Sequence, residues 1–259
     1  MASSRDTEVK SAKRVLEVFE YFLQLQRPAT VNEVMKALGY PQSSTSSLLK
    51  SLTKLRYLHY DRYERTYLPT MRIAILGGWL YDKMFSGASL SRIVETLHQE
   101  SGQSVIIGMQ NDIYVQYIHV VQPRNPELPW YLKPGSLRPL CHAAVGRVLL
   151  SCKADVEVLA LLRRINGEEP DPARRLSATA LFSELDLIRD QGYAYTEGTV
   201  NPVAGVVAVG IPTPASQPPM AVGIGGQIET IRKNKAHFLE LLRSALQPYT
   251  VEPDEASPP

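Results

Sequence analysis

Residues 39–55 read GYPQSSTSSLLKSLTKL, and this stretch decides the fold of the first third of the chain. The tight turn Tyr40-Pro41 leads into a segment whose apolar residues recur at helical spacing. Its predicted buried stripe consists of Leu48, Leu52 and Leu55. The opposite face carries mainly small hydroxyl groups, which form a weak helix in isolation. Short polar side chains at a helix N-terminus instead suit close entry into the major groove of DNA.

The segments on either side complete a recognisable order. Upstream, apolar spacing predicts a helix from Ser11 to about Leu25, and Thr30-Val31-Asn32-Glu33 forms a capping box that starts a second, short helix. Gly39 provides the left-handed stop of that helix. Downstream, 57–61 and 66–69 are two strand-like runs around a polar turn, which predicts a β-hairpin. This is the order of a winged helix-turn-helix. The alternative is a helical subdomain whose serine-rich helix only faces solvent.

Charge is distributed unevenly along the chain. Residues 1–70 contain eleven Lys and Arg against seven Asp and Glu, a net charge of +4, whereas the remainder contains 17 against 19, a net charge of −2. A basic N-terminal third suggests a polyanionic partner for that end.

The rest of the chain predicts a second, larger domain. An apolar helical run over 71–86 is predicted to link the domains and to pair with its copy in a dimer, and a helix over 89–100 follows. Asn111-Asp112 separates two strand-like runs and indicates a hairpin. Further strands are expected at 104–109, 114–120, 130–132, 193–196, 206–211 and 220–226, with helices at 143–151, 154–165, 177–191 and 229–246. This order predicts an antiparallel or mixed sheet with helices packed on it, followed by a disordered tail at 248–259.

Several classes of protein are disfavoured. The 259 residues suit two domains, no run approaches the roughly 20 apolar residues of a membrane span, and the polar N-terminus without a leader-like core predicts the cytoplasm. Cys141 and Cys152 are too few for a disulfide framework or a four-cysteine zinc site. The histidines show no metal-ligand pairing, Gly223-Ile224-Gly225-Gly226 lacks the Lys-Ser/Thr of a phosphate loop, and no Gly-x-Ser-x-Gly elbow occurs. We therefore expect no enzyme, no metal and no cofactor.

With these elements in place, the chain resembles the IclR family of bacterial transcription regulators from about Ser11 to Leu246. Three motifs carry the resemblance: the recognition-helix entry at 39–49, the effector-domain signature Pro139-Leu140-Cys141-His142-Ala143-Ala144-Val145-Gly146-Arg147, and the helix-to-strand junction at 188–194. The resemblance implies an α+β chain with a winged helix-turn-helix at 1–70, a linker helix at 71–86 and a GAF-like effector-binding domain at 87–247. It also implies a homodimer or homotetramer and a palindromic DNA operator.

The sequence departs from the family at the DNA-reading helix, where basic residues usually stand in place of Gln42 and Ser47. We expect a different base-edge pattern to be read by Gln42, Ser43, Ser44, Ser46, Ser47 and Lys50. Candidates for contacts with the DNA backbone, which set register and salt dependence, are Lys13, Arg14, Arg62 and Arg65.

The sensor positions also differ. Acid-binding members of the family place an Asp, a Cys and two Ser around the ligand carboxylate; the matching positions here are Thr196, a residue within 206–208 (Val207 is taken), Gly223 and Gly225. Two glycines in place of serines are expected to open volume for a bulkier, even aromatic, acid. The remaining candidates around the pocket are Met109, Tyr117, His142, Ala143, Ala144, Val145 and Glu197. Core packing is the alternative role for each of them.

The sequence therefore predicts a DNA-binding transcription regulator whose C-terminal domain binds a small organic acid that changes operator affinity. The alternative is an architectural or adaptor protein whose C-terminal domain only oligomerises. The sequence leaves open the effector, the operator, the direction of regulation and the choice between dimer and tetramer.

Overall fold

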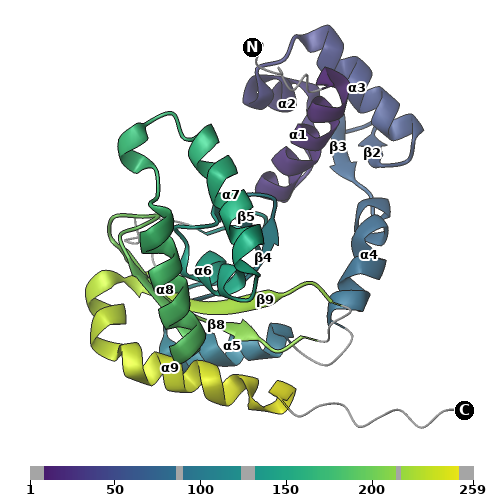
Figure 1. The fold of residues 1–259 in the computed structure, drawn as a ribbon. Helices are drawn as coiled ribbons and strands as arrows, with labels where there is room; N and C mark the ends of the chain where they lie inside the picture. Colours follow the sequence, from purple (N-terminus) through teal and green to yellow (C-terminus); the bar gives the residue numbers. More distant parts are fainter. Residues whose placement is uncertain (1–8, 86–89, 124–131, 214–216, 251–259) are drawn as a thin grey trace, which may run out of the picture. The chain divides into compact units, whose positions relative to one another are not determined.

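The computed structural model describes residues 9–85, 90–123, 132–213 and 217–250. The chain divides into two compact units, Met1–Ser86 and Gly87–Pro259 (Figure 1), and each is described by itself.

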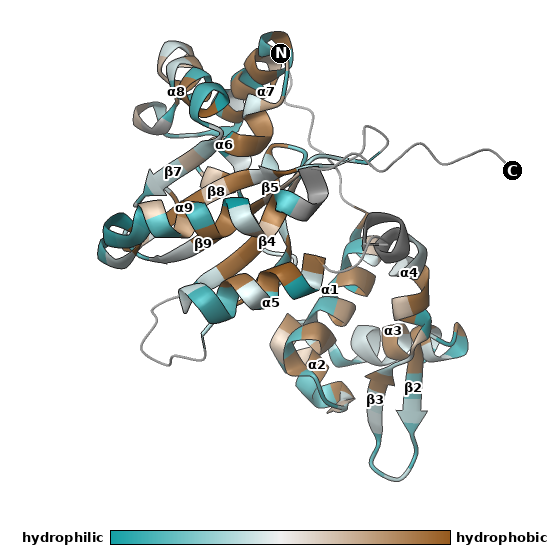
Figure 2. Cartoon of the chain, turned by 90° about the horizontal axis from the view of Figure 1, so that it is seen from below, coloured by the Kyte–Doolittle hydropathy of each residue, from teal (hydrophilic) through white to brown (hydrophobic). Residues whose placement is uncertain are grey.

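The described part of the N-terminal unit consists of three helices, a small sheet and a fourth helix at its end. The helices are α1 (Lys10–Leu25), α2 (Val31–Leu38), α3 (Gln42–Lys54) and α4 (Arg72–Phe85). The sheet has the antiparallel order β1 (Ala29–Thr30), β3 (Thr66–Pro69), β2 (Leu58–Asp61). The β2–β3 hairpin extends away from the helices of this unit (Figure 2), so the predicted winged helix-turn-helix is confirmed.

Local sequence signals fix the ends of α2 as predicted. Thr30 Oγ1 accepts a hydrogen bond from the Glu33 amide, and the Glu33 carboxylate accepts one from the Thr30 amide at 2.8 Å. Gly39 ends the helix in the left-handed region at φ 68°, a conformation that costs glycine little. These two ends set the short turn that leads into α3.

The buried face of α3 differs from the predicted one. Thr45, Leu49 and Leu52 are buried, whereas Leu48 is only partly buried and Leu55 is 58% exposed at the C-cap. The predicted stripe of Leu48, Leu52 and Leu55 was therefore wrong at Leu55, whereas Leu48 packs against the core at its edge. Thr45 can be buried because its hydroxyl donates to the Pro41 carbonyl at 3.0 Å, which satisfies its polar group locally.

The C-terminal unit is built on one six-stranded sheet with the order β6-β5-β4-β9-β8-β7, antiparallel throughout. The strands are β4 (Ser104–Asn111), β5 (Tyr114–Val121), β6 (Leu137–Pro139), β7 (Tyr193–Glu197), β8 (Ala204–Ile211) and β9 (Met220–Gln227). The helices are α5 (Leu90–Ser101), α6 (Ala144–Ser151), α7 (Asp155–Glu168), α8 (Ala178–Gln191) and α9 (Ile228–Thr250), with a short 3-10 turn η1 (Pro172–Arg174).

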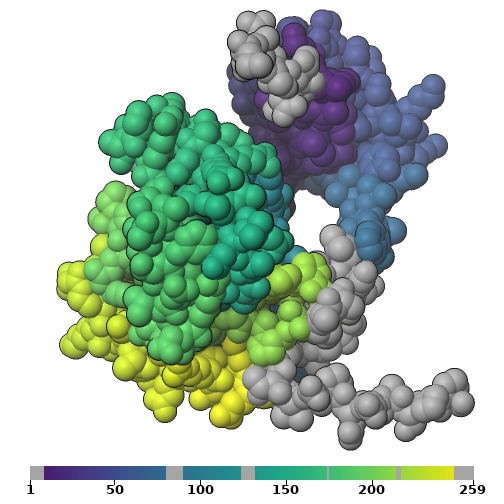
Figure 3. All heavy atoms as spheres, in the orientation of Figure 1, coloured from purple at the N-terminus to yellow at the C-terminus, as the bar shows by residue number. Residues whose placement is uncertain are grey.

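Helices cover both faces of this sheet. Helices α5 and α9 pack on one face, and α6 packs on the other against β4, β8 and β9, with α8 outside it (Figure 1). In the space-filling view, the side chains of α9, in yellow, form one outer surface of this unit (Figure 3). The core between the sheet and α6 contains Ile106, Tyr117, Leu149 and Leu185 among others. An antiparallel sheet with helices on both of its faces confirms the expected α+β class.

Two predicted segments differ from the structure. The expected strand at 130–132 lies mostly outside the described residues, and the strand at that end of the sheet is β6, which follows the Pro134-Gly135 turn. Helix α9 continues to Thr250, beyond the predicted end at 246, so the tail predicted to be disordered over 248–259 is helical at 248–250, and its remainder at 251–259 lies outside the described residues. Within the described ranges, none of the helices is both long and apolar enough to cross a membrane.

Candidate functional site

Helix α3 presents a polar face along its whole length. Gln42, Ser43, Ser47 and Lys50 are exposed, whereas Ser44 and Ser46 are partly buried. Helix α3 has no acidic residue in its first turn and no side-chain cap at Pro41, so its first backbone amides are available to an anion. Ser51 and Lys54 continue the exposed face by helical spacing and were missed in the sequence. The i, i+4 spacing of Lys50 and Lys54 in the sequence indicates that both lie on the same face of the helix.

The wing turn is held by a single carboxylate. Asp61 Oδ1 accepts hydrogen bonds from the backbone amides of Tyr63 and Glu64, at 2.8 and 3.0 Å, and these bonds lower the Asp61 pKa. Arg65 closes the turn with φ 54°. The predicted Arg62 and Arg65 are exposed at this tip, and Tyr63 between them is 96% exposed. Tyr63 was not among the predicted contacts, although its place between two arginines in a polar turn indicated it.

The other two predicted backbone contacts lie on α1. Lys13 is exposed, and the Arg14 guanidinium lies 4.8 Å from the centroid of the Tyr40 ring, in the turn that precedes α3. Tyr40 in turn donates its hydroxyl proton to Glu17. Arg14 is thereby fixed near the entry of the recognition helix, where a cation favours phosphate binding.

The C-terminal unit contains a small cavity between the sheet and the start of α6, with a volume of about 70 Å³. Strands β4, β5, β8 and β9 supply its floor, and the turn after β7 closes one side. Its apolar and glycine lining consists of Ile106, Leu132, Ala143, Ala144, Val200, Ala204, Gly205, Val206, Gly225 and Gly226. Its polar lining consists of Tyr117, Arg138, Thr196, Thr199 and Asn201.

A close backbone contact positions α6 over this cavity. A Cβ atom on Gly146 would lie 2.1 Å from the Leu140 carbonyl oxygen, so only glycine allows the helix to pack against residue 140. The Arg147 guanidinium donates to the Cys141 carbonyl at 2.9 Å and pairs with Glu184 of α8 at 2.9 Å. The N-cap Ala143 has no capping side chain, and Ala143 and Ala144 line the cavity. The positive end of the α6 dipole therefore faces the cavity.

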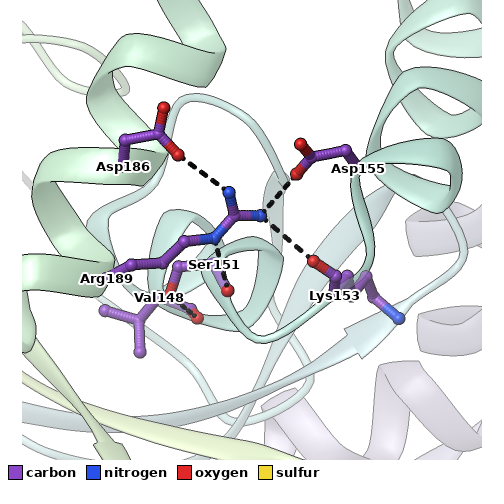
Figure 4. Close-up of polar contacts among 6 residues, drawn as sticks. All are labelled: Val148, Ser151, Lys153, Asp155, Asp186 and Arg189. Carbon is purple, nitrogen blue, oxygen red and sulfur yellow. Dashed lines mark hydrogen bonds and ion pairs between the residues drawn. The ribbon is translucent and has the colours of Figure 1, made fainter.

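The other end of α6 is held by Arg189 of α8 (Figure 4). Its guanidinium pairs with Asp155 at 2.8 Å and Asp186 at 2.9 Å, and it donates to the carbonyls of Ser151 and Lys153. One side chain thus joins the end of α6, the start of α7 and α8. This arrangement fixes the roof of the cavity.

Three polar side chains of the cavity have donors that can meet a ligand. Tyr117 and Thr196 are buried residues, and no hydrogen bond of either hydroxyl is found among the described residues. The Arg138 guanidinium donates to the Leu137 carbonyl at 2.9 Å and lies with its Cζ 5.7 Å from the Tyr117 ring centroid, and within the described ranges it pairs with no carboxylate. Burial raises the Tyr117 pKa to about 12, so its phenol stays protonated and can donate. Two hydroxyl donors and a guanidinium without a carboxylate partner line one cavity, and this set suits a bound anionic group.

The predicted effector residues separate into two groups. Tyr117, Ala143, Ala144, Thr196 and Gly225 come together in the cavity lining. The others do not line it: Met109, His142, Val145, Glu197, Val207 and Gly223. The residues missed in the sequence include Arg138, Thr199, Asn201 and Val206; Arg138 directly follows an expected loop and gave no periodic signal.

Packing explains why several predicted residues lie elsewhere. Val206 rather than Val207 lines the cavity, because alternate residues of β8 face opposite sides of the sheet. Glu197 points to α9, where Arg232 binds both of its carboxylate oxygens at 2.9 and 2.7 Å, and this pairing lowers the Glu197 pKa to about 2. Val145 is fully buried in the core.

The two glycines do not enlarge the cavity as predicted. A Cβ atom on Gly223 would lie 3.2 Å from Val145 Cγ2 and from Val206 Cγ1, and one on Gly225 would lie 3.2 Å from Val206 Cγ2. Valine methyl groups therefore fill the space that serine side chains would take. The expectation of added volume was wrong, and the cavity is small and largely apolar with a cationic edge at Arg138.

Cys141 is a buried thiol whose pKa burial raises to about 11, so it is neutral and unreactive near pH 7. Across the described residues, no group of three or more His, Cys, Asp or Glu side chains could hold a metal ion.

Two family models match the chain. The IclR helix-turn-helix domain matches residues 11–62, and the C-terminal domain of the bacterial transcriptional regulator IclR matches residues 87–248. The chain is 23% identical over 249 residues to the HTH-type transcriptional regulator KdgR of Dickeya chrysanthemi, covering 93% of this chain and 79% of that protein. It is 24% identical over 186 residues to XynR of Escherichia coli K12, another HTH-type transcriptional regulator, covering 72% and 73%.

Solved structures show the same fold. An IclR transcriptional regulator from Alicyclobacillus acidocaldarius superposes with a TM-score of 0.68 at 18% identity, covering 94% of this chain and 98% of that one. The effector domain of an IclR regulator from Acinetobacter sp. ADP1 superposes with a TM-score of 0.60 at 27% identity, covering 66% and 99%. With both of its domains matched in order, the chain belongs to the IclR family of DNA-binding transcriptional regulators.

Proposed function

We propose that this regulator binds a small organic acid in the cavity of its C-terminal effector domain, and that the bound acid changes its affinity for a palindromic operator. The observation that supports the proposal is that Arg138, Tyr117 and Thr196 line one largely apolar cavity. Among the described residues, the Arg138 guanidinium has no carboxylate partner and the two hydroxyls make no hydrogen bond. A carboxylate accepts hydrogen bonds from all three donors, and the apolar lining accommodates its carbon chain.

On the DNA side, the exposed face of α3 reads base edges through Gln42, Ser43, Ser47 and Lys50. Lys13, Arg14, Arg62 and Arg65 contact phosphates and set the salt dependence of binding. The protein acts in the cytoplasm as a homo-oligomer, and the bound acid shifts the relative placement of two DNA-binding units. The family and its relatives are transcriptional regulators, so the chain is a regulator and not an enzyme.

Calorimetric titration of the full chain tests the acid. We expect butyrate to bind and butyramide, its neutral isostere, to bind at least about tenfold more weakly, because hydrogen bonds to a charged group are the stronger ones. Arg138→Gln is expected to remove this preference, whereas Arg163→Gln, on the exposed side of α7 and away from the cavity, preserves it.

Operator affinity provides the second measurement. A duplex selected from a random pool is titrated with and without the acid, and the acid is expected to change the affinity in the wild type but not in Arg138→Gln. Equal binding of acid and amide, or a DNA affinity insensitive to every acid, contradicts the proposal. The latter outcome favours an adaptor whose C-terminal domain only oligomerises.

A further inference from the structure

A second, larger hollow lies on the outer side of the turn that closes the cavity. It is a groove of about 720 Å³ between the tip of the β4–β5 hairpin, the end of α7 and the turn at 198–202. Its apolar wall consists of Ile113, Tyr114, Ile165, Ala173, Leu176 and Pro202. His142, predicted for the effector pocket, lines this groove instead of the cavity.

The cavity and the groove share one wall. Thr199 and Val200 line both, and both residues are exposed. Within the described ranges, the Thr199 hydroxyl donates to the His142 carbonyl at 2.7 Å, and Asn201 accepts from the backbone amides of Val203 and Ala204, which follow it in the chain. Gly198, with φ +66°, begins the turn in the left-handed region. The segment at Thr199 and Val200 separates the two spaces, and the hydrogen bond from Thr199 to His142 ties it to the residues before α6.

Their volumes limit what each can hold. An engineered cavity of about 150 Å³ accepts one benzene molecule, and the cavity here measures about 70 Å³. It therefore has room for a carboxylate and a few carbon atoms, but not for a ring. A larger acid has to extend past Thr199 and Val200, and on that side the apolar groove continues from the cavity wall.

We infer that the effector is an elongated amphiphilic acid, with its carboxylate at Arg138 in the cavity and an apolar chain or ring in the groove. The inference rests on the proposed acid-binding function and adds the tail site to it. Binding displaces the segment around Thr199 and opens its hydrogen bond to His142. The groove is lined by the apolar residues named above and by the polar residues His142, Glu168, Glu169 and Arg175.

A series of acids with one head group tests the inference by calorimetry on the full chain. The probes are propionate, 3-phenylpropionate and 5-phenylpentanoate. We expect affinity to rise along the series by about tenfold or more, because the added chain and ring bury apolar surface in the groove. Equal affinity for all three acids overturns the inference and leaves the proposed function intact. Failure of all three acids to bind contradicts the proposed function itself.

Two groove variants are tested, so that the inference can still be judged if one of them fails to fold. Ala173→Trp fills the groove, and Tyr114→Ala removes part of its wall; neither residue lines the cavity. Both variants are expected to lose the preference for 5-phenylpentanoate while retaining propionate binding. Val156→Trp, on an exposed position of α7 outside both spaces, is the matched control. An unchanged preference in both groove variants, or an equal loss in the control, overturns the inference.

Discussion

Tyr63 lies at the tip of the wing with its ring in solvent, in a turn that is held by hydrogen bonds from the Tyr63 and Glu64 amides to Asp61. An exposed aromatic ring between two arginines suits the sugar-phosphate backbone, where the ring packs and the hydroxyl donates. Tyr63→Ala is therefore expected to weaken operator binding by about 0.5–1.5 kcal/mol without lowering thermal stability. Fluorescence anisotropy with a selected duplex measures the effect, and Tyr114→Ala in the other unit is the control. Unchanged affinity contradicts the assignment.

Gly146 allows a second test at the residue scale. Because an added Cβ atom would lie 2.1 Å from the Leu140 carbonyl oxygen, Gly146→Ala forces α6 away from the cavity. We expect a loss of about 2–3 kcal/mol of unfolding free energy, measured by chemical denaturation. Gly167, in α7, has no atom within 4 Å of such a Cβ, and Gly167→Ala is expected to be neutral or stabilising by up to about 1 kcal/mol. Equal effects of the two substitutions would show that the close contact does not matter.

At the scale of the element, the capping box of α2 has a pH-dependent part. The Thr30 backbone amide, followed by the Arg27 side chain and the Thr30 hydroxyl, lowers the Glu33 pKa from 4.5 to about 2. A lowered folded-state pKa contributes stability above pH 4.5 that is lost as the pH falls from 4.5 to about 2. The carboxylate is partly exposed, so solvent screening keeps this contribution below about 1 kcal/mol.

Glu33→Gln is therefore expected to lower the melting temperature at pH 7 and to have no effect near pH 2. Thermal unfolding followed by circular dichroism across this range measures the difference from the wild type. Glu20→Gln, on the exposed side of α1, makes the same change in net charge. A pH-independent difference between Glu33→Gln and the wild type contradicts the argument.

An element could be predicted when the residues that determine it are neighbours in the sequence. The capping box, the Gly39 stop and the hairpin turn at Asp112 are written in consecutive residues, and all three occur in the structure. The face of α3 was misassigned because Leu48 and Leu49 are both apolar, and two stripes of equal spacing fit the pattern. The buried face is distinguished by Thr45, which is polar but can be buried because its hydroxyl donates to the Pro41 carbonyl.

The cavity was predictable only in part, for a different reason. Residues of the α6 start and of β7 and β9 were found through the resemblance to a family. Arg138, Thr199 and Asn201 lie in it because β6 and the turn after β7 meet in three dimensions. The choice between Val206 and Val207 needed the strand register, since a shift of one residue reverses the face.

At the scale of the whole molecule, each unit has the means for one half of the regulatory function. The N-terminal unit carries the exposed polar helix and basic wing, and the C-terminal unit carries a cavity lined by Arg138, which has no carboxylate partner among the described residues. Under the proposed function, cooperation between them involves a partner copy, because a palindromic operator presents two half-sites to two recognition helices. The segment that could join two copies must therefore expose apolar surface in a single chain.

Helix α4 is such a segment. Ile75 and Trp79 of α4 and Met71 just before it recur every four residues, and all are more than half exposed. An apolar stripe of this kind on a helix suits packing against a second copy of itself. Ile75→Glu combined with Trp79→Glu is therefore expected to halve the mass in sedimentation velocity.

The same double variant should bind a full palindrome no better than a single half-site, because the two recognition helices are no longer tethered to each other. Titration of both duplexes by anisotropy measures the ratio of the two affinities. Val156→Glu, on the exposed face of α7, adds a charge without touching the stripe and is expected to keep the wild-type mass and ratio. If the double variant retains the wild-type mass and its preference for the palindrome, α4 does not join the copies, and the pairing must come from another surface.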